Sequence, residues 1–373
     1  MKKILLLGPF SINKEGITGQ SIANETLYNG LKDKYSVDKI NTYKNIGFEN
    51  KEDQGKFKVK KFLKIIISIF NEISLMMKNK YDVIYMTPGQ SYLGFLRFAP
   101  YMMCAFFLDK PCYVHIHGGN FRNMYNAQSK MRKKILEYFF KRIAGVIVLG
   151  ESLKKMFEGL IDAKKIFVCE NGVQDEIIAT KEEIENKKNQ FFSKEKKKIL
   201  YLSNLMKEKG ILEVLEVSKC FKENEIEFNL AGDIEPNIKE IVEKYLKEYP
   251  QKLFYHGIVN GIYKKKLLLD SDTFILPSYD EGQPISILEA YVNGCAVITD
   301  ENIGGIKDIF KDSMNGKNCK IKNIESIYSA IKNILNGNEF IEKNYEYGIN
   351  KFSKDCFIER IEKIIIKNKN GEL

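Results

Sequence analysis

The sequence predicts an α/β protein made of two doubly wound, Rossmann-like domains that face each other across a cleft. Short apolar runs alternate with longer stretches of helical spacing through most of the chain, as is typical of parallel sheets covered by helices. A length of 373 residues exceeds what one compact core usually holds and favours two domains. A charged segment from Thr180 to Lys198 interrupts the alternation, and we place the linker there.

The first domain is predicted to cover residues 1–180. The apolar runs that we expect to form its strands are Lys3–Leu7, Val37–Ile40, Asp82–Met86, Cys112–His115 and Gly145–Leu149. The stretches with helical spacing are Ser21–Asp33, Val59–Lys78, Tyr92–Phe107, Met131–Arg142 and Leu153–Phe157. In such sheets, ligands bind on the loops that follow the carboxyl ends of the strands.

The second domain is predicted to cover residues 196–350. Its expected strands are Ile199–Leu202, Glu227–Leu230, Leu253–His256, Thr273–Leu276 and Ala296–Thr299. Helical spacing between them covers Ile211–Phe221, Ile238–Tyr249 and Tyr263–Leu269. Residues Ile324–Ile334 and Asn338–Ile366 are also predicted to be helical. We expect the segment from about 352 to 373 to pack back on the first domain.

The composition indicates a protein of a reducing compartment. The seven cysteines show no paired, metal-type spacing, and three histidines are too few for a His-rich metal site. The N-terminus, Met1–Gly8, is basic and then apolar, as a signal peptide is, but the apolar run is short and a polar loop follows it. We therefore expect a buried first strand and a cytoplasmic protein.

The positive charge is concentrated in the first domain. Residues 1–150 hold 24 Lys and Arg against 11 Asp and Glu, whereas the rest of the chain holds 35 against 38. An anionic surface is the expected partner, and because no nucleic-acid motif is apparent, we favour the inner leaflet of the cytoplasmic membrane. Three stretches could contact a membrane: Lys56–Lys80, Tyr92–Leu108 and Lys130–Arg142. The first and last combine basic and apolar residues, and the middle one is apolar but contains Arg97. Burial against the sheet explains their apolar residues equally well.

Two carboxylates flank a predicted helix start after the strand Thr273–Leu276. Glu281 lies in the loop, Pro284 suits a first helical turn, and Glu289 follows about a turn and a half into the helix. The free backbone amides between them would attract phosphate, and a nucleotide sugar carries hydroxyls on both sides of a diphosphate. By spacing alone, a helix that merely carries two exposed glutamates is an equally good interpretation.

Other strand ends carry residues that suit the same ligand. Gly19 opens a helix after the first strand, where a glycine lets backbone amides approach phosphate. His117 ends the fourth strand and precedes a glycine pair, so we predict a site role for it and a structural role for His115. Asn171 lies in a turn at a strand end. Lys209 immediately precedes a helix, where it can meet a diphosphate as a point charge.

The stretch from Pro277 to Ile298 resembles the retaining glycosyltransferases of the GT-B fold, most closely glycosyltransferase family 4 (group 1). It contains the pattern Pro-Ser-x-x-Glu-Gly-x-Pro-x-x-x-Leu-Glu-Ala between Pro277 and Ala290. Gly304 and Gly305 match the glycine pair that follows in that family. With this context, the spacing of the two glutamates becomes a specific signal.

The resemblance implies a nucleotide-sugar donor, commonly a UDP-sugar, and neither a metal nor another cofactor. It implies that Glu281 meets the donor sugar, that Glu289 holds the ribose hydroxyls, and that Lys209 and helix-end amides hold the diphosphate. Glu281, His117 and Lys209 are thus the implied catalytic residues. The implied donor-binding residues are Gly19, Asn204, Ile258 (near the base), Gly282, Gln283, Pro284, Ile285, Ser286, Ile287, Leu288 and Glu289. Thr18, Gly118 and Asn171 are expected to contact the acceptor or the sugar.

One position departs from the family pattern. The family usually has Gly-Arg-Leu where this chain has Ser203-Asn204-Leu205, so the phosphate-binding arginine is missing and Lys209 must supply more of the charge. The expected reaction is sugar transfer to a lipid-linked glycan in capsule, O-antigen or exopolysaccharide synthesis. The alternatives are a nucleotide-sugar epimerase of the same fold and a non-catalytic relative that binds a glycan or a lipid.

Overall fold

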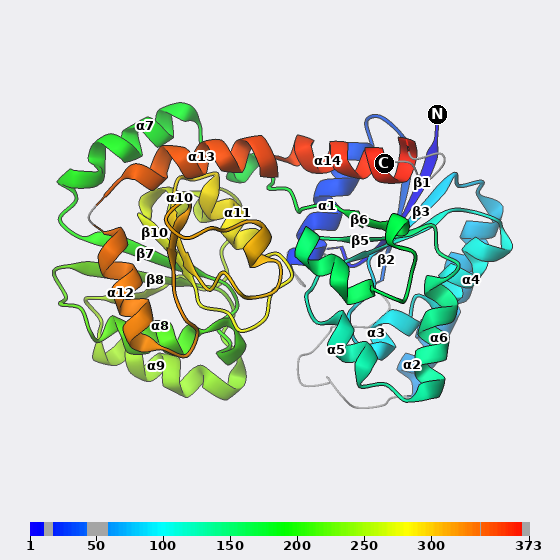
Figure 1. Ribbon diagram of the computed structural model, residues 1–373, viewed down its shortest axis with the longest axis horizontal. Helices are drawn as coiled ribbons and strands as arrows, with labels where there is room; N and C mark the ends of the chain where they lie inside the picture. The colour runs from blue at the N-terminus through cyan, green and yellow to red at the C-terminus, as the bar shows by residue number, and fades with distance from the viewer. Residues whose placement is uncertain (11–17, 43–58, 336, 368–373) are drawn as a thin grey trace. The chain divides into compact units, whose positions relative to one another are not determined.

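The computed structural model describes residues 1–10, 18–42, 59–335 and 337–367, with the side chains of 59–66 excepted (Figure 1). The chain divides into two compact units. Unit 1 comprises Met1–Asn171 and Phe357–Leu373, and unit 2 comprises Gly172–Cys356. The chain therefore passes between units after Asn171 and again after Cys356, whereas the sequence places the linker near residues 180–196 and the return near 352.

Unit 1 contains a six-stranded sheet in the order β2-β1-β3-β4-β5-β6. Every neighbouring pair of strands is parallel. The strands are β1 (Lys3–Gly8), β2 (Ser36–Asn41), β3 (Val83–Met86), β4 (Cys112–Ile116), β5 (Gly145–Val148) and β6 (Ile166–Val168). The strand order reverses between β1 and β3, and the loops after strands at such a switch point line the usual ligand crevice.

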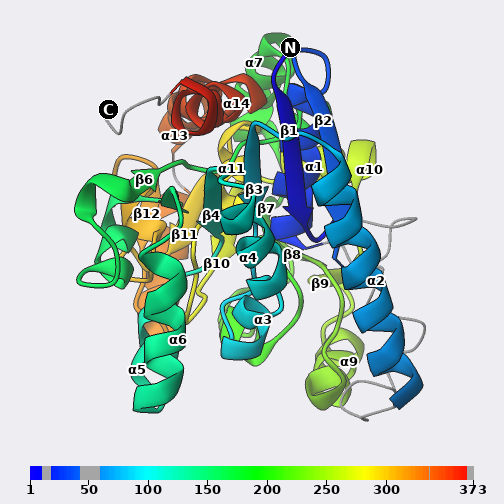
Figure 2. The same ribbon diagram turned by 90° about the vertical axis from the view of Figure 1, so that its right-hand side faces the viewer.

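Helices cover both faces of this sheet because its side chains are apolar in both directions. Alternate residues such as Leu5 and Ile84 pack against α2 (Val59–Lys78), α3 (Tyr92–Leu96), α4 (Ala99–Phe107), α5 (Phe121–Asn126) and α6 (Lys130–Phe140) (Figure 2). On the opposite face, Ile4 and Tyr85 pack against α1 (Gly19–Leu31) and against Phe357–Ile366, at the end of α14 (Lys354–Glu362) and the π-helical turn Lys363–Lys367. The predicted return of the C-terminal segment to the first domain is thus present.

The single helix predicted over Tyr92–Phe107 is two helices. Pro100 lies in the first turn of α4, where its missing amide costs nothing, so a new helix starts there and α3 ends before it. The predicted helix Leu153–Phe157 is a 3₁₀ segment, Glu151–Phe157.

Unit 2 contains a second six-stranded parallel sheet, in the order β12-β11-β10-β7-β8-β9. Its strands are β7 (Lys197–Leu202), β8 (Ile226–Ala231), β9 (Leu253–Tyr255), β10 (Thr273–Leu276), β11 (Ala296–Thr299) and β12 (Gly316–Asn318). Counted within the unit, this is the Rossmann order 3-2-1-4-5-6 read from its other edge. The switch point therefore lies between β7 and β10.

The helices of unit 2 lie on both sides of its sheet (Figure 1). On one side are α8 (Ile211–Ser218), α9 (Lys239–Glu248) and α12 (Ile324–Ile334). On the other are α7 (Lys181–Gln190), α10 (Gly261–Asp270), α11 (Ile285–Tyr291) and α13 (Glu339–Phe352). Most apolar residues of the strands and helices form one core, and a smaller cluster of Ala179, Ile184, Phe191 and Ile341 lies around α7, so that unit 2 has its own core and is a domain in its own right.

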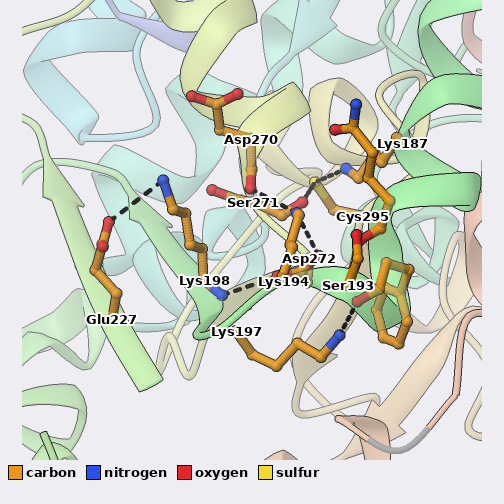
Figure 3. A network of polar contacts seen from close by, with 12 residues as sticks. Lys187, Ser193, Lys194, Lys197, Lys198, Glu227, Asp270, Ser271, Asp272 and Cys295 are labelled. Carbon is orange, nitrogen blue, oxygen red and sulfur yellow. Dashed lines mark hydrogen bonds and ion pairs between the residues drawn. The ribbon is translucent and has the colours of Figure 1, made fainter. Parts of the chain in front are cut away.

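The charged segment that the sequence marks as a linker is α7, and it belongs to unit 2. Its Lys187 is buried, and its amine donates to the carbonyls of Asn293 (2.7 Å) and Leu268 (3.2 Å) and lies 3.4 Å from Cys295 Sγ (Figure 3). Nearby, Lys194 pairs with the buried Asp272 at 2.6 Å. A charged side chain can be buried where hydrogen-bond acceptors surround it. For Lys187, backbone carbonyls at the amino-terminal edge of the sheet are those acceptors.

Candidate active site

The loops after β7 and β10 meet at the switch point of unit 2. The first loop, Ser203–Gly210, contains the 3₁₀ turn Lys207–Lys209, and the second, Pro277–Pro284, leads into α11. Two hydrogen bonds join them: the Tyr279 amide donates to Glu208 O (2.9 Å), and the Ser278 side chain donates through Oγ to the same carbonyl (3.2 Å). These contacts fix the two loops against each other.

Lys209 and Glu281 form an ion pair at this junction. Lys209 Nζ lies 2.7 Å from Glu281 Oε1, with 27% of the lysine side chain and 10% of the glutamate side chain exposed. A cation and a carboxylate thus stand side by side where a doubly wound sheet binds ligands. Lys209 can attract a phosphate, and Glu281 can accept hydrogen bonds from hydroxyls.

A buried tyrosine, which the sequence does not single out, supports the lysine loop. Tyr201, at the end of β7, is fully buried, and its hydroxyl lies 3.0 Å from Asn204 O and 3.3 Å from Lys209 O. Burial is the larger cause and the nearby charge of Glu281 the smaller one that raise the pKa of Tyr201 well above its ordinary value. The hydroxyl of Tyr201 therefore stays neutral and donates hydrogen bonds. Its contacts fix the backbone that carries the candidate cation.

Glycines allow this part of the site to close tightly. Gly304 has φ +50°, and a Cβ there would lie 1.7 Å from Glu281 O. Gly305 donates its amide to the same oxygen at 3.4 Å. Gly210 has φ +75°, and its Cβ would lie 2.2 Å from Pro277 O. The glycine pair of the sequence motif thus positions the backbone of the first glutamate.

Glu289 lies in α11 and is almost completely buried. Its Oε1 is 2.5 Å from the amine of Lys264, a buried residue of α10. The interpretation of two exposed glutamates on a helix is therefore wrong for Glu289. A carboxylate kept under the surface with a cation beside it is prepared to accept hydrogen bonds.

The first turn of α11 offers fewer amides than the sequence implies. The Ile287 amide donates to Pro284 O at 3.1 Å, so it is already occupied, while the side chains of Ile287 and Leu288 belong to the core. Among the described residues, the amides of Ile285 and Ser286 have no such acceptor. Gly282 and Gln283, which precede the helix, are buried.

Around β9, the surface beside this site is apolar and aromatic. Ile258 is 63% exposed, and Ile262 and Tyr263 beside it are exposed as well. His256 is held by Tyr263 OH at Nδ1 (2.8 Å) and by Asn229 Oδ1 at Nε2 (2.7 Å). Asn204, which stands where the family has arginine, is exposed. Its amide is uncharged, so it cannot replace the positive charge of an arginine.

In unit 1, the histidine that follows β4 is enclosed but unpartnered. Both ring nitrogens of His117 are buried and contact no hydrogen-bonding group among the described residues. Burial lowers the pKa of His117 to about 3, so the ring is neutral near pH 7. His115 stacks on it with ring centroids 4.2 Å apart, and its Nδ1 lies 2.6 Å from Tyr85 OH, in keeping with a structural role.

The neighbouring loops of unit 1 hold the other predicted contacts. Thr18 caps α1 by accepting the Ser21 amide (3.1 Å), and Gly19 is the first residue of that helix. A Cβ at Gly118 would lie 1.5 Å from Gln90 Nε2, so only a glycine leaves room for the Gln90 side chain. Gln90 Oε1 accepts the Asn120 amide at 2.9 Å. Asn171 is buried.

The structure brings together Lys209 and Glu281 directly, with Glu289 in the helix that follows. Because each unit is described by itself, the convergence of His117 on these residues stays a prediction. In the part of the chain that the structure describes, no three His, Cys, Asp or Glu side chains form a group suited to a metal ion. None of the described helices combines the length and apolarity of a membrane span.

Comparison with known proteins agrees with this geometry. Residues 182–351 match the family model described as Glycosyl transferases group 1. The UDP-Gal:alpha-D-GlcNAc-diphosphoundecaprenol alpha-1,3-galactosyltransferase of Escherichia coli is 27% identical in an alignment of 325 positions that covers 82% of this chain and 78% of that protein. The poly(ribitol-phosphate) alpha-N-acetylglucosaminyltransferase of Staphylococcus aureus is 27% identical over 66% of this chain and 48% of its own length.

Solved structures show the same fold. The crystal structure of Anabaena Alr3699/HepE in complex with UDP and glucose matches with a TM-score of 0.71 and 14% identity, over 97% of this chain and 99% of that one. The two parallel six-stranded sheets are those of GT-B glycosyltransferases. The chain is thus a GT-B glycosyltransferase whose residues 182–351 form a domain of the Glycosyl transferases group 1 family.

Proposed function

We propose that this enzyme, as a member of family 4, moves a sugar from a UDP-sugar to a lipid-linked glycan acceptor with retention of anomeric configuration. The product would be a cell-surface polysaccharide such as capsule, O-antigen or exopolysaccharide. The observation that carries the proposal is the Lys209–Glu281 pair, 2.7 Å apart at the switch point of a Rossmann-type sheet. A second buried carboxylate, Glu289, lies in the next helix.

Each donor group has a counterpart in these residues. Glu281 accepts from hydroxyls of the transferred sugar, and Lys209 with the amides of Ile285 and Ser286 binds the diphosphate. Glu289 accepts from the ribose hydroxyls, and the base lies beside Ile258. On the side of unit 1, Gly19 adds an amide for the diphosphate and His117 meets the transferred sugar. Thr18, Gly118 and Asn171 contact the acceptor or the sugar.

The transfer step needs a stabilised leaving group. As the bond from the anomeric carbon to the diphosphate oxygen breaks, that oxygen takes the electron pair, and Lys209 holds the developing charge. The acceptor oxygen bonds to the carbon from the same face and passes its proton to the leaving phosphate oxygen. We propose that no metal takes part, because a lysine stands where the diphosphate charge develops.

The relatives support the donor, the acceptor class and the stereochemistry. The Escherichia coli relative is named for a UDP-sugar and a diphosphoundecaprenol acceptor, and the solved relative was crystallised with UDP. Two relatives are named as transferases that form alpha linkages. Since UDP-galactose itself is an α-glycoside, an alpha product means retention.

A panel of nucleotide sugars tests the proposal. We expect slow hydrolysis of one UDP-sugar, measured as UDP release, and faster release when a lipid-diphosphate-linked sugar is added. A chelator should leave the rate unchanged. Release of a different nucleotide would refute the UDP donor, and an epimerised donor without UDP release would favour the epimerase. If no donor is bound or turned over, the non-catalytic alternative gains.

For the acceptor side, we propose that unit 1 docks on the anionic inner leaflet, which would make the enzyme cytoplasmic and peripheral. Large apolar side chains are exposed on α2, α3, α4 and α6: Ile67, Phe70, Leu75, Met77, Leu93, Met103, Phe107, Met131 and Tyr138. Exposed cations interleave with them on α6 and just after it, where Arg142 lies 3.8 Å from the Tyr138 ring centroid. Apolar anchors among cations suit an anionic interface. The side chains of the predicted basic segment 56–66 lie outside the described residues.

Replacing two of these anchors should weaken membrane binding. Phe70 and Phe107 are 69% and 79% exposed, so Phe70→Asp with Phe107→Asp should preserve the fold and lower binding to phosphatidylglycerol vesicles roughly 10-fold. Sedimentation with vesicles measures this, and higher salt should weaken wild-type binding. Phe192→Asp, at a 70% exposed position in unit 2, is the control. Equal binding by all variants would refute the docking surface.

A further inference from the structure

Lys264 is a buried cation that the proposed transfer does not use. Its amine lies 2.5 Å from Glu289 Oε1, and only 9% of the lysine side chain and 4% of the glutamate side chain are exposed. The two residues come from α10 and α11, which flank the end of β10 in the chain. In a chain with 59 Lys and Arg, a lysine buried to this degree needs a specific reason.

The pair has the properties of a prepared hydrogen-bond acceptor. Burying a carboxylate is costly unless a cation or a hydrogen-bond donor pairs with it, and Lys264 is that partner here. Among the described residues, only Lys264 donates to the Glu289 side chain, and it does so at one oxygen. Asn293 contacts the backbone carbonyl of Glu289 instead, at 2.8 Å. The second carboxylate oxygen therefore keeps its lone pairs for another donor.

We propose that Lys264 is a positioning residue for nucleotide recognition, an inference that rests on the proposed donor site. It fixes the side-chain conformation in which Oε2 of Glu289 accepts from the ribose hydroxyls. Lys264 thereby gives the enzyme its preference for ribonucleotides over 2′-deoxyribonucleotides. The same segment carries Ile258 just before α10, so one stretch of chain places both the base neighbour and the lysine behind the ribose carboxylate.

Binding of two nucleotides to lysine variants tests this role. Calorimetric titration with UDP and with 2′-deoxy-UDP gives the ribose preference as a ratio of dissociation constants. A hydrogen bond to a charged acceptor predicts a wild-type preference of roughly 10- to 100-fold. Lys264→Met should lose most of this preference, because the affinity should fall more for UDP, which offers both ribose hydroxyls, than for 2′-deoxy-UDP, which offers only the 3′-hydroxyl. The exposed Lys266→Met, two residues away, should keep the wild-type ratio.

Further variants separate positioning from folding. Lys264→Arg restores the cation and should recover part of the preference. Lys264→Gln keeps an N–H donor on a side chain one bond shorter, and without the charge it should lose at least about 3-fold of the preference. A purely structural pair would lower the melting temperature and leave the UDP to 2′-deoxy-UDP ratio intact.

The titrations distinguish failure of the positioning role of Lys264 from failure of the proposed donor site. If the wild type prefers UDP and both Lys264→Met and Lys264→Gln keep that preference, the positioning role is overturned and the donor site stands. If the wild type binds both nucleotides equally, Glu289 does not contact the 2′-hydroxyl and the positioning role for ribose preference falls. If the wild type binds neither, the proposed donor site fails and the inference fails with it.

Discussion

Glu281→Gln should reduce transfer by roughly 10²- to 10³-fold in kcat, the largest loss expected from one side chain. Glutamine keeps the size of the residue but removes the charge that pairs with Lys209 at 2.7 Å. It also replaces one of the two carboxylate oxygens by a donor, so the hydroxyls of the transferred sugar lose an acceptor. UDP release with and without acceptor measures the effect.

Two comparisons make the result specific to the site. Glu240→Gln changes an exposed carboxylate on α9 of the same unit and should leave kcat unchanged. UDP alone should bind Glu281→Gln within a few-fold of the wild type, because the carboxylate is assigned to the sugar and not to the nucleotide. Full activity in the folded Glu281→Gln variant would remove this residue from the mechanism.

Gly304→Ala should lower kcat about 100-fold although residue 304 contacts no substrate in the proposed mechanism. A Cβ there would lie 1.7 Å from Glu281 O, so the loop that carries Glu281 must move by more than an ångström. Displacements of that size at a reacting group cost about two orders of magnitude in rate. The left-handed backbone, φ +50°, adds about 1 kcal/mol of strain.

Gly159→Ala separates the clash from the strain. Gly159 also has a positive φ, +75°, but no atom lies within 4 Å of the added Cβ. This control should lose a similar amount of stability in thermal unfolding and retain its rate. If both variants keep the wild-type kcat, the Gly304 turn does not position the catalytic loop.

The sequence predicts most strands because parallel strands that are buried on both faces form continuous apolar runs. Two features are harder to predict from it. β12 (Gly316–Asn318) contains Lys317 between two polar or small residues, so no apolar run marks it. The charge of α7 suggests a solvated linker, and only tertiary contacts such as those of Lys187 reveal that it packs into unit 2.

The candidate site shows the same division. Glu281 and its glycine-rich loop are predictable because a strand, a turn and a helix start follow one another in the chain. The groups that support these residues cannot be predicted in the same way. Lys264, the partner of Glu289, precedes it by 25 residues, and the Tyr201 side chain contacts the backbone of the loop that carries Lys209. Which of 59 basic side chains faces which carboxylate depends on how α10 and α11 pack.

Unit 2 lies in the sequence between the two segments that form unit 1, and this determines the order in which the units can complete their folding during protein synthesis. Unit 2 is one continuous segment, Gly172–Cys356, and its core needs no residue from outside it. One face of the unit 1 sheet, with Ile4, Leu6 and Tyr85, stays uncovered by Phe357–Ile366 until the ribosome has made all of unit 2. The nascent first unit therefore waits, partly open, for a segment that emerges 185 residues later. During that delay the apolar face of the sheet lacks this cover, and chaperones would bind the nascent chain at this stage.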